Sequence, residues 1–548
     1  MSARRTGLLS PKAAGSPSPR TSARRFIIAL LACWAVSASG ATSPGEAFFT
    51  DPIRTIAIQV DEPGLEVLKK NDRSYVHATV TEGTNVFRDV GIHLKGMGSF
   101  RPFNEKPSFS VKFDRYIEKQ RFHGLTKLML NNASQDGTYL AELLATQMFR
   151  DAGVPAARVT HAFVEVNGRA LGLYVVIEAM NKEFLRQYFL NTRGNLYEAY
   201  LQDIDQKLDQ DGGIDDTQAD LKRLLKVCQL TDRAERWRQL PDVLDVDGYL
   251  SHLTVELFTS HTDGYAMNRN NYRLYHDPST DRFVFLAHGI DWAFANGGIS
   301  IRPQRNTIVT RAILETPEGQ RAYRARSRSL FTNVFQIAVL TNRVNEAVAR
   351  LRKAARNPNE ANDFEGYGVD MRNRILARHK NISDQLAAPE PKPLPFGTNG
   401  VAYLAGWYTK KGRGEAGVID QQKVDDRMTL HVRAEKRETT ASWRTKVLLE
   451  EGRYTLEGRA RASSIVALTN KVEPTKAEPN KEPGYGAGLR VSLDKRSNAL
   501  IGNQDWILLQ HEFVVAPGED EKEMVCELRA TEGEVWFDVS TLRLVRRP

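Results

Sequence analysis

Apolar and polar residues alternate along the first part of the chain with the period of two that is typical of half-buried β-strands. Six short stretches are predicted to be strands, at residues 53–60, 75–81, 89–94, 108–113, 162–166 and 172–178. Asn167 and Gly168 lie between the last two, and Asn-Gly is a favoured hairpin turn. Between the fourth and fifth, apolar residues recur at helical spacing over residues 139–151, and Gly153 is the stop signal. This region is therefore predicted to contain mostly strands and one helix.

Beyond residue 181 the apolar period becomes that of amphipathic helices. Four helices are predicted, at residues 182–189, 220–229, 246–260 and 330–355. A pair of short strands, 271–275 and 282–286, interrupts them and is joined by turn residues. A strand-rich part followed by a helix-rich part predicts a bilobal α+β domain over residues 50–386.

A proline-rich linker at residues 387–399 separates this domain from a different pattern. Residues 400–548 contain short alternating strands between turn signals, without a convincing helix. That pattern predicts an all-β sandwich. The length of 548 residues also favours more than one domain, so the predicted fold class is multi-domain.

The first 41 residues have the features of a signal peptide. A basic stretch ends at Arg24 and Arg25, an apolar block follows at 26–36, and small residues precede the expected cleavage near Ala38 or Ala41. A lipoprotein site at Cys33 and a twin-arginine signal are the alternatives. No other segment has the length and apolar character of a membrane span, so we expect an exported protein with no integral membrane contact after cleavage.

Charge and cysteine content exclude two classes of protein. The formal charge is +9, but the segment before residue 26 contributes much of it, and no local Lys/Arg stripe suggests nucleic-acid binding. Beyond Cys33 in the signal, only Cys228 and Cys526 remain, in different predicted domains. This excludes a disulfide framework, and buried thiols are expected instead.

The densest cluster of chemically useful residues follows the predicted helix 246–260. His261, Asp263 and Asn268 have the spacing of a protein-kinase catalytic loop, in which a carboxylate faces the attacking hydroxyl and an amide oxygen holds a metal ion. Asp291 follows the strand pair, where a kinase places its second metal-binding carboxylate. Loops rich in Asp and Asn are also common turns, which is the structural alternative.

A kinase also needs a lysine for the nucleotide phosphates and a helix glutamate that holds this lysine. Lys112 on the predicted strand 108–113 is the first candidate and Lys106 the second, with Glu142 of the helix as partner. Solvent-facing charges are the alternative for each. The turn 95–99 contains two glycines and offers backbone N–H groups to phosphates, or it is a plain turn.

The sequence resembles the CotH kinases, a family named for a spore-coat protein. The resemblance covers roughly residues 50–385, and its motifs lie at 106–113, 122–127, 167–178, 263–272 and Asp291. It implies an atypical protein-kinase-like fold that binds ATP with Mg²⁺ or Mn²⁺ and phosphorylates hydroxyls of a protein substrate.

Carried over by position, the resemblance makes Asp263 the catalytic aspartate, and Asn268 or Asn271 with Asp291 the metal ligands. Lys106, Lys112 and Glu178 are expected at the nucleotide. The chain departs from the family pattern at 95–99, where R-G-x-S is usual, and at Gly289, where a second aspartate is often found. A pseudokinase scaffold is therefore the alternative. The acid-rich run 203–220 is expected to be a solvated loop, because its spacing fits no EF-hand, and a source of further metal ligands is the alternative.

The region 400–548 resembles carbohydrate-binding modules of the jelly-roll type. Its motifs surround Gly452, Gly488, Asp505 and Gly533. The resemblance implies a glycan partner that stacks on exposed aromatic rings, and makes a surface adhesion or glycan-binding protein a further alternative. The candidate rings are Trp407, Tyr408, Trp443, Tyr485 and Trp506. Trp536 is expected to face the core.

Overall fold

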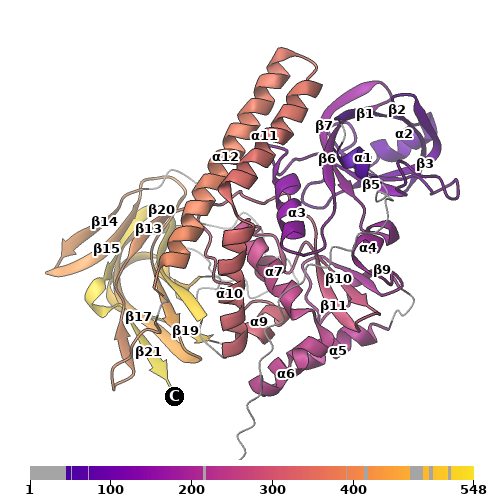
Figure 1. Cartoon of the computed structure of the whole chain (residues 1–548). Helices are drawn as coiled ribbons and strands as arrows, with labels where there is room; N and C mark the ends of the chain where they lie inside the picture. The colour runs from indigo at the N-terminus through magenta and orange to yellow at the C-terminus, as the bar shows by residue number, and fades with distance from the viewer. Residues whose placement is uncertain are drawn as a thin grey trace, which may run out of the picture. The chain divides into compact units, whose positions relative to one another are not determined.

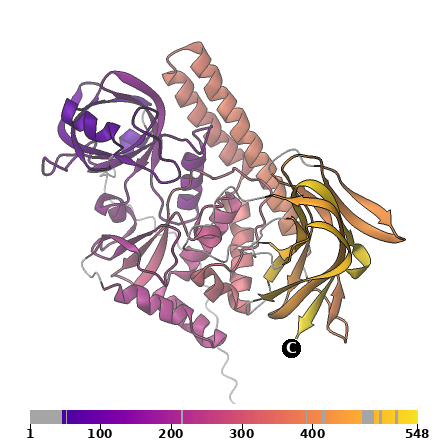
Figure 2. The same ribbon diagram turned by 180° about the vertical axis from the view of Figure 1, so that it is seen from behind.

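The computed structural model describes residues 45–50, 52–71, 73–213, 217–389, 392–412, 417–468, 486–492, 498–515 and 520–548. Figures 1 and 2 draw the chain from opposite sides. The expected signal peptide lies outside the described residues, as does Tyr485. No helix in the described segments has the length and apolar character needed to span a membrane.

Seven strands of the first part close into a barrel, drawn in indigo to purple in Figure 1. They run in the order β1-β2-β3-β4-β5-β7-β6, and a parallel pairing of β1 with β6 completes the closure. Their bounds are β1 Arg54–Gln59, β2 Val76–Glu82, β3 Asn85–Lys95, β4 Ser108–Lys112, β5 Lys127–Asn131, β6 Val159–Val166 and β7 Arg169–Glu178. Asn167 and Gly168 both have positive φ, as the predicted hairpin turn requires. The sequence did not predict β5.

Three helices accompany the barrel: α1 Glu46–Thr50, α2 Glu62–Lys69 and α3 Ala141–Asp151. Helix α3 agrees with the predicted helix at 139–151. Its apolar face, including Leu144 and Met148, shares one hydrophobic cluster with Val255, Phe258 and Ile290 of the following region. This packing joins the helix that carries Glu142 to the segments around the candidate catalytic loop.

The second part contains a small sheet surrounded by helices. Its strands follow the order β11-β10-β8-β9. The bounds are α4 Lys182–Tyr188, β8 Leu196–Ala199, β9 Asp209–Gly212, α5 Ala219–Cys228, α6 Arg233–Val243, α7 Val246–Phe258, α8 Tyr265–Asn268, β10 Tyr272–Asp277, β11 Arg282–Ala287, α9 Ile308–Leu314, α10 Pro317–Asn333, α11 Ile337–Ala354 and α12 Pro358–Ala387.

Two predictions for this part were wrong. The single helix expected at 330–355 is two helices, α10 and α11, because the chain turns at Val334 and buries Phe335 in the core. The acid-rich run 203–220 is not a solvated loop throughout. Asp203 is buried and accepts hydrogen bonds from the Tyr265 hydroxyl and the Ile308 amide, and β9 lies within the run.

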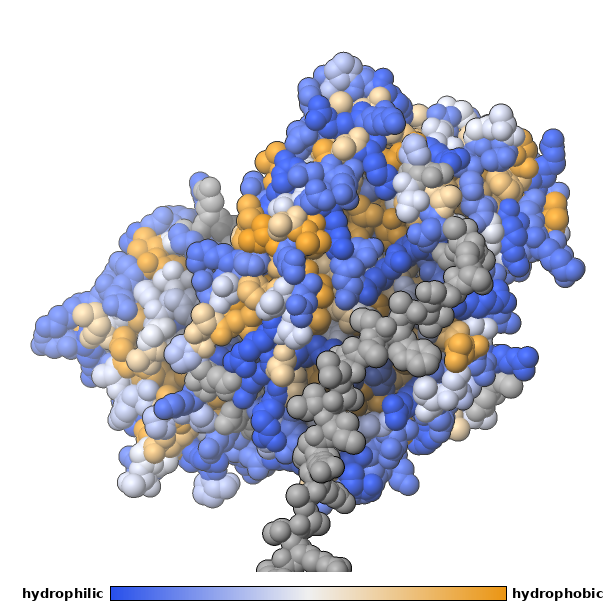
Figure 3. Space-filling view, in the orientation of Figure 1, coloured by the Kyte–Doolittle hydropathy of each residue, from blue (hydrophilic) through white to orange (hydrophobic). Residues whose placement is uncertain are grey.

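Helices α11 and α12 form an antiparallel hairpin (Figure 1). Its free end is mostly hydrophilic (Figure 3), and ion pairs such as Arg356–Glu360 and Arg352–Glu365 lie there. The buried side of α12 instead packs Phe364, Met371 and Ile375 into the cluster that also contains α3 residues. The hairpin is therefore part of the core on one side and solvated on the other.

The chain beyond residue 400 is built from strands in one hydrogen-bonded network with its own hydrophobic cluster. The strands are β12 Val401–Tyr403, β13 Tyr408–Lys411, β14 Ile419–Val424, β15 Arg427–Ala434, β16 Thr439–Leu449, β17 Gly452–Ala467, β18 Gly486–Val491, β19 Gly502–Val515, β20 Asp520–Asp538 and β21 Arg543–Arg547. Within the described segments of this part, the one helical turn is η1 Val539–Thr541. The chain is thus mixed α/β first and β-rich last. The bilobal and jelly-roll descriptions and the domain boundaries stay predictions.

Candidate active site

Asp263 lies in the short turn between α7 and α8, and its carboxylate is held by three asparagines. The side-chain amides of Asn270 and Asn271 donate to Oδ2 at 3.1 and 2.8 Å, and the amide of Asn268 donates to Oδ1. Both expected metal ligands of this loop, Asn268 and Asn271, therefore contact the expected catalytic aspartate. The side chain of Asp263 keeps partial exposure to solvent.

A buried glutamate of α7, Glu256, binds the backbone of this loop. Oε1 of Glu256 accepts a hydrogen bond of 2.8 Å from the Ala266 amide at the start of α8. A Cβ atom at Gly264 would lie 2.6 Å from the Glu256 carboxyl group, so this position requires glycine. Burial raises the pKa of Glu256 to about 8 and lowers the pKa of the neighbouring His252 to about 3. Glu256 and His252, which lie next to the loop, are therefore both uncharged near neutral pH.

Asp291 follows β11 and lies near the other acidic groups of the site. Burial raises its pKa, the positive charge of Lys95 opposes this, and the charges of Asp136 and Asp263 add to it. The two aspartates that the sequence selected therefore interact electrostatically. A nearby cation would therefore stabilise the charged form of Asp291.

Gly289 has no side chain for a physical reason. Its φ is +59°, a left-handed conformation that side chains disfavour, and a Cβ atom there would lie 2.5 Å from Oδ1 of Asn271. The amide of Asn271 thus occupies the space into which a side chain at 289 would project. This accounts for the departure from the two-aspartate pattern.

Glu142 of α3 belongs to the same group. Its side chain is buried, and the amide of Asn131 donates to Oε2 at 3.4 Å. Burial raises the pKa of Glu142, the charge of Asp291 adds to this, and Lys95 opposes it. The structure therefore brings Glu142, Asp291 and Lys95 together.

The two lysines selected from the sequence lie elsewhere. Lys106 donates a 2.7 Å hydrogen bond to the Tyr139 hydroxyl and lies over the rings of Tyr139 and Tyr174. Lys112 pairs across the strands with Gly91 and Lys127, and its charge acts on Lys127. Neither lysine has an interaction with Glu142 among the described contacts.

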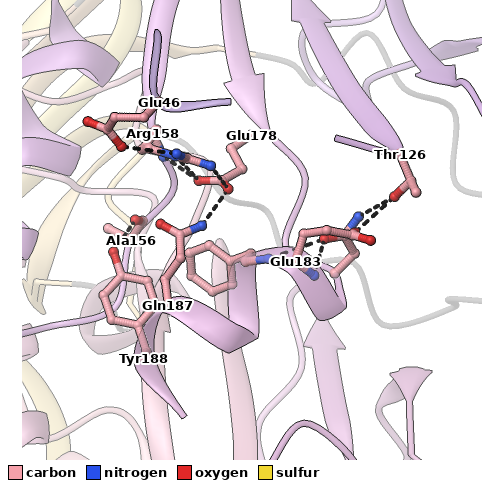
Figure 4. A network of polar contacts seen from close by, with 10 residues as sticks. Glu46, Thr126, Ala156, Arg158, Glu178, Glu183, Gln187 and Tyr188 are labelled. Atoms are coloured by element: carbon pink, nitrogen blue, oxygen red, sulfur yellow. Dashed lines mark hydrogen bonds and ion pairs between the residues drawn. The ribbon is translucent and has the colours of Figure 1, made fainter. Parts of the chain in front are cut away.

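Glu178 is held by other partners, as Figure 4 shows. Arg158 forms an ion pair of 2.5 Å with its Oε1, and Gln187 donates to the same oxygen at 2.6 Å. Oε2 accepts from the Arg158 backbone amide and from Nε of its side chain. Glu178 is thereby bound at the junction of β7 and α4, and the structure does not join it to the acidic group.

The comparison with known sequences agrees with this geometry. The profile of the family described as "CotH kinase protein" matches residues 92–384, more than half of the chain. The chain belongs to this family. Inner spore coat protein H of Bacillus subtilis (strain 168) is 22% identical to this CotH-family chain over 306 residues, 51% of this chain and 81% of the relative.

Similarity to solved structures is weak. HipA of Shewanella oneidensis MR-1, in a complex with HipB and operator DNA, is 10% identical and covers 55% of this chain and 66% of its own, with a TM-score of 0.25. The Helicobacter pylori proinflammatory kinase CtkA is 8% identical, with 53% and 96% coverage and a TM-score of 0.24. TmCBM61, in complex with β-1,4-galactotriose, is 13% identical, with 26% and 91% coverage and a TM-score of 0.18. Such scores carry no argument, so CotH membership rests on the sequence.

The residues of the CotH site fit a hard divalent cation whose coordination substrate phosphates complete. Asp291 supplies a carboxylate, and Asn268 and Asn271 supply amide oxygens, which are ligands that Mg²⁺ accepts. Among the described residues, no three His, Cys, Asp or Glu side chains are grouped as metal ligands. Mg²⁺ is commonly held by one or two carboxylates together with substrate phosphates, and this donor set suits that mode.

Sequence reasoning missed Lys95, Asn131 and Glu256. Lys95 directly precedes the glycine turn, which was considered only for its backbone N–H groups. Asn131 lies at the end of β5, a strand that was not predicted. Glu256 lies in a predicted helix, but only the chain fold brings it beneath Ala266.

Proposed function

We propose that this chain is an exported, metal-dependent protein kinase that transfers the γ-phosphate of ATP to serine or threonine hydroxyls of a protein substrate. CotH-family membership supports the kinase chemistry. The basic and apolar N-terminal pattern supports export, as does similarity to a protein named for the inner spore coat. Mg²⁺ or Mn²⁺ is the proposed metal.

One observation carries the proposal: the acidic groups converge. Asp263 is oriented by Asn268, Asn270 and Asn271, and the charge of Asp263 acts on Asp291. Phosphoryl transfer requires a carboxylate at the acceptor hydroxyl and metal-binding residues at the phosphates. These two groups of residues must lie a short distance apart. A set of ordinary turn residues would not be expected to gather Glu142 from a distant helix.

In this proposal Asp263 orients the acceptor hydroxyl and takes its proton. The hydroxyl oxygen bonds to the γ-phosphorus as the bond from that phosphorus to the bridging oxygen breaks, and ADP leaves. Asp291 and Asn268 or Asn271 would hold the metal, which neutralises charge on the phosphates. The asparagine hydrogen bonds fix the carboxylate orientation before substrate arrives.

The test is transfer of labelled γ-phosphate from ATP to a generic protein acceptor by the purified chain, with Mg²⁺ or Mn²⁺. Asp263→Asn and Asp291→Ala are each expected to lower transfer by about a hundredfold or more. Asp247→Ala is the matched control, because the Asp247 side chain is exposed and pairs with Arg326. Folding of each variant is checked by its circular dichroism spectrum.

Incorporation by the wild type and by Asp247→Ala, lost in the other two variants, would support the kinase. No incorporation by folded wild-type protein with either metal would favour the pseudokinase alternative. Activity that survives in Asp291→Ala would contradict the proposed metal site.

A second proposal concerns the β-rich part: glycan binding on one face of its sheet. Trp536 was expected in the core, and this expectation was wrong. Val535 and Phe537 are fully buried, whereas Trp536 is on the opposite face, where its ring stacks beside His431 at 5.3 Å. Its indole N–H donates to Gln422 at 3.0 Å, which fixes the ring orientation.

Trp506 extends the same surface. Its indole N–H donates to Asp425, which also accepts from Arg461, the residue opposite Trp536 in the strand pairing. Two partly exposed rings among hydrogen-bonding side chains suit a sugar, which presents an apolar face and a polar rim. By contrast, Trp443 is buried and donates to a backbone carbonyl, so it is a core residue.

Titration of the chain with a panel of oligosaccharides tests this proposal. Trp536→Ala is expected to lower affinity by about tenfold, since it removes a stacking surface. Tyr200→Ala, an exposed aromatic residue of the kinase-like part, serves as control. Absence of binding across the panel, or binding unaffected by Trp536→Ala, would contradict it.

A further inference from the structure

The strand that precedes α3 carries an asparagine at the position beside Glu142. In protein kinases a strand lysine pairs both with the α/β-phosphates and with the helix glutamate. Here the residue of β5 next to Glu142 is Asn131, whose amide donates to the glutamate while its Oδ1 accepts from the Ser108 hydroxyl at 3.2 Å. A neutral amide with both ends in use does not balance phosphate charge, so the cation must come from another residue.

Lys95 is in the same row of side chains, two strands away. It is the last residue of β3 and lies opposite Ser108 of β4, and Ser108 in turn contacts Asn131 of β5. Adjacent strands are about 4.8 Å apart, so the row is short enough for a lysine side chain to extend along it. The row Lys95–Ser108–Asn131 therefore leads directly to Glu142.

The electrostatic neighbours of Lys95 agree with this geometry. Its pKa is lowered by burial, and three carboxylates, those of Glu142, Asp291 and Glu198, raise it in opposition. Across the described part of the chain, Lys95 makes no direct ion pair with any of them. The ammonium group is thus held among acidic groups without being committed to one.

The backbone after Lys95 is shaped to end the strand there. Gly96 has a φ of +105°, and a Cβ atom at this residue would lie 3.0 Å from the Ser99 hydroxyl and 3.1 Å from the Phe100 amide. Only glycine adopts this tight turn without strain. The turn therefore fixes Lys95 as the final residue of the strand.

We propose that Lys95 is the cation that binds the α/β-phosphates of the nucleotide, supplied by β3, while Asn131 occupies the strand position next to the helix glutamate. This inference rests on the proposed kinase function for its nucleotide ligand. It replaces Lys112, which lies between Gly91 and Lys127, and Lys106, which is bound to Tyr139. Glu142 then holds both Asn131 and, through charge, Lys95.

The experiment measures binding of Mg²⁺–ATP to the full chain by calorimetry, separately from phosphate transfer. Lys95→Met is expected to weaken binding by about tenfold or more, because charge-assisted contacts to phosphate are lost. Lys95→Arg should retain most of the affinity. Lys112→Met is the matched control on the next strand and should bind within about twofold of wild type.

A relocation variant sharpens the test. In Lys95→Met/Asn131→Lys the cation returns to β5 beside Glu142, and nucleotide affinity is expected to recover relative to Lys95→Met alone. Thermal unfolding of each variant without nucleotide separates lost binding from lost folding. Equal ATP affinity in wild type and folded Lys95→Met would overturn the inference.

The outcomes also separate this inference from the proposed function. If wild type binds ATP and Lys95→Met does not, but no phosphate is transferred, Lys95 is the phosphate cation of a pseudokinase. If wild type transfers phosphate and Lys95→Met does so equally well, the kinase stands and the Lys95 assignment fails. If wild type binds no nucleotide, both fail.

Discussion

The aspartates and asparagines of the candidate active site, here called the acidic side, come from one stretch, residues 263–291. Lys95 and the row of side chains that leads from it to Glu142, here called the basic side, are assembled from β3, β4, β5 and α3. On the acidic side Asp263 contacts asparagines five to eight residues away. On the basic side Lys95 and Glu142 belong to elements that meet only through strand register and helix packing. The first arrangement is visible in sequence spacing, and the second is not.

The two sides also differ in what holds them. On the acidic side, two buried side chains bind backbone groups. Glu256 accepts a hydrogen bond from the Ala266 amide, and Arg378 donates to the Leu257 carbonyl. The basic side depends on a row of short polar side chains across three strands. Changes to Glu256 or Arg378 should therefore reduce stability and transfer together, while changes to the row should alter nucleotide binding first.

The largest effect is expected from Arg378→Met. Arg378 of α12 is fully buried and donates to four backbone carbonyls, those of Leu257, Phe258, Gly297 and Ile299. These flank the turn that carries Asp263 and the segment after Asp291. Removing the donor leaves buried carbonyls unsatisfied, so we expect a loss of about 3 kcal/mol or more in urea unfolding.

Arg374→Met is the matched control for that variant. Arg374 lies one turn earlier on α12 and pairs with Asp370 at the surface. An exposed pair of this kind is worth less than about 0.5 kcal/mol. Similar unfolding of the two variants would show that α12 does not brace the acidic side.

Gly289→Ala should have the next largest effect. The methyl group must enter the space of the Asn271 amide at a positive φ, which costs about 1–3 kcal/mol. Displacing Asn271 also releases one of the contacts to Asp263, so transfer should fall more than ATP affinity. Gly298→Ala is a suitable control, because a Cβ atom there meets nothing closer than 3.6 Å. Full transfer by Gly289→Ala would show that the acidic side tolerates displacement.

The contrast explains what the sequence predicted. Spacing and chain order selected Asp263, Asn268 and Asp291, because a catalytic-loop pattern is local, and the family resemblance added Asn271. Helical periodicity correctly gave α3, and with it Glu142. The family and the change from a mixed α/β part to a β-rich part were also evident from motifs and periodicity.

The missed features all depend on contacts between distant segments. Lys95 was passed over because its relation to Glu142 requires the β3–β4–β5 register, and β5 itself is only five residues long. Lys112 was preferred because it lies on a clearly alternating strand, but strand alternation does not say which row of residues meets the helix. Trp536 could face either side of its strand, and apolar character favoured the wrong one.

Glu256→Gln should change the slope of the free energy of unfolding against pH. The folded pKa of about 8 lies above the ordinary value of 4.5, so the folded state keeps a proton that the unfolded state loses. Stability from this group is present below pH 4.5 and is lost as pH rises towards 8, with a slope of at most about 1.4 kcal/mol per pH unit. Glutamine abolishes this slope and still accepts from Ala266.

Urea unfolding of wild type and Glu256→Gln at pH 5, 6, 7 and 8 measures the difference. The nearby His252 and His261 titrate below this window in the folded state, with pKa values lowered by burial to about 3 and about 4. Both proteins contain them, so their contribution cancels in the comparison. Parallel curves would mean that Glu256 is charged in the folded protein.

The smallest effect on the site is expected from Lys106→Met, which tests whether the basic side includes this lysine. Its ammonium is engaged by the Tyr139 hydroxyl and by the rings of Tyr139 and Tyr174, so its loss should cost about 1 kcal/mol of stability. Burial lowers the pKa of Lys106 from 10.5 to about 8, so the unfolded state binds more protons than the folded state between these values, and the stability contribution of Lys106 should rise as the pH increases above about 8. ATP affinity should stay within about twofold of wild type. A tenfold loss of ATP affinity with unchanged stability would instead place Lys106 at the phosphates and make the basic side a two-lysine site.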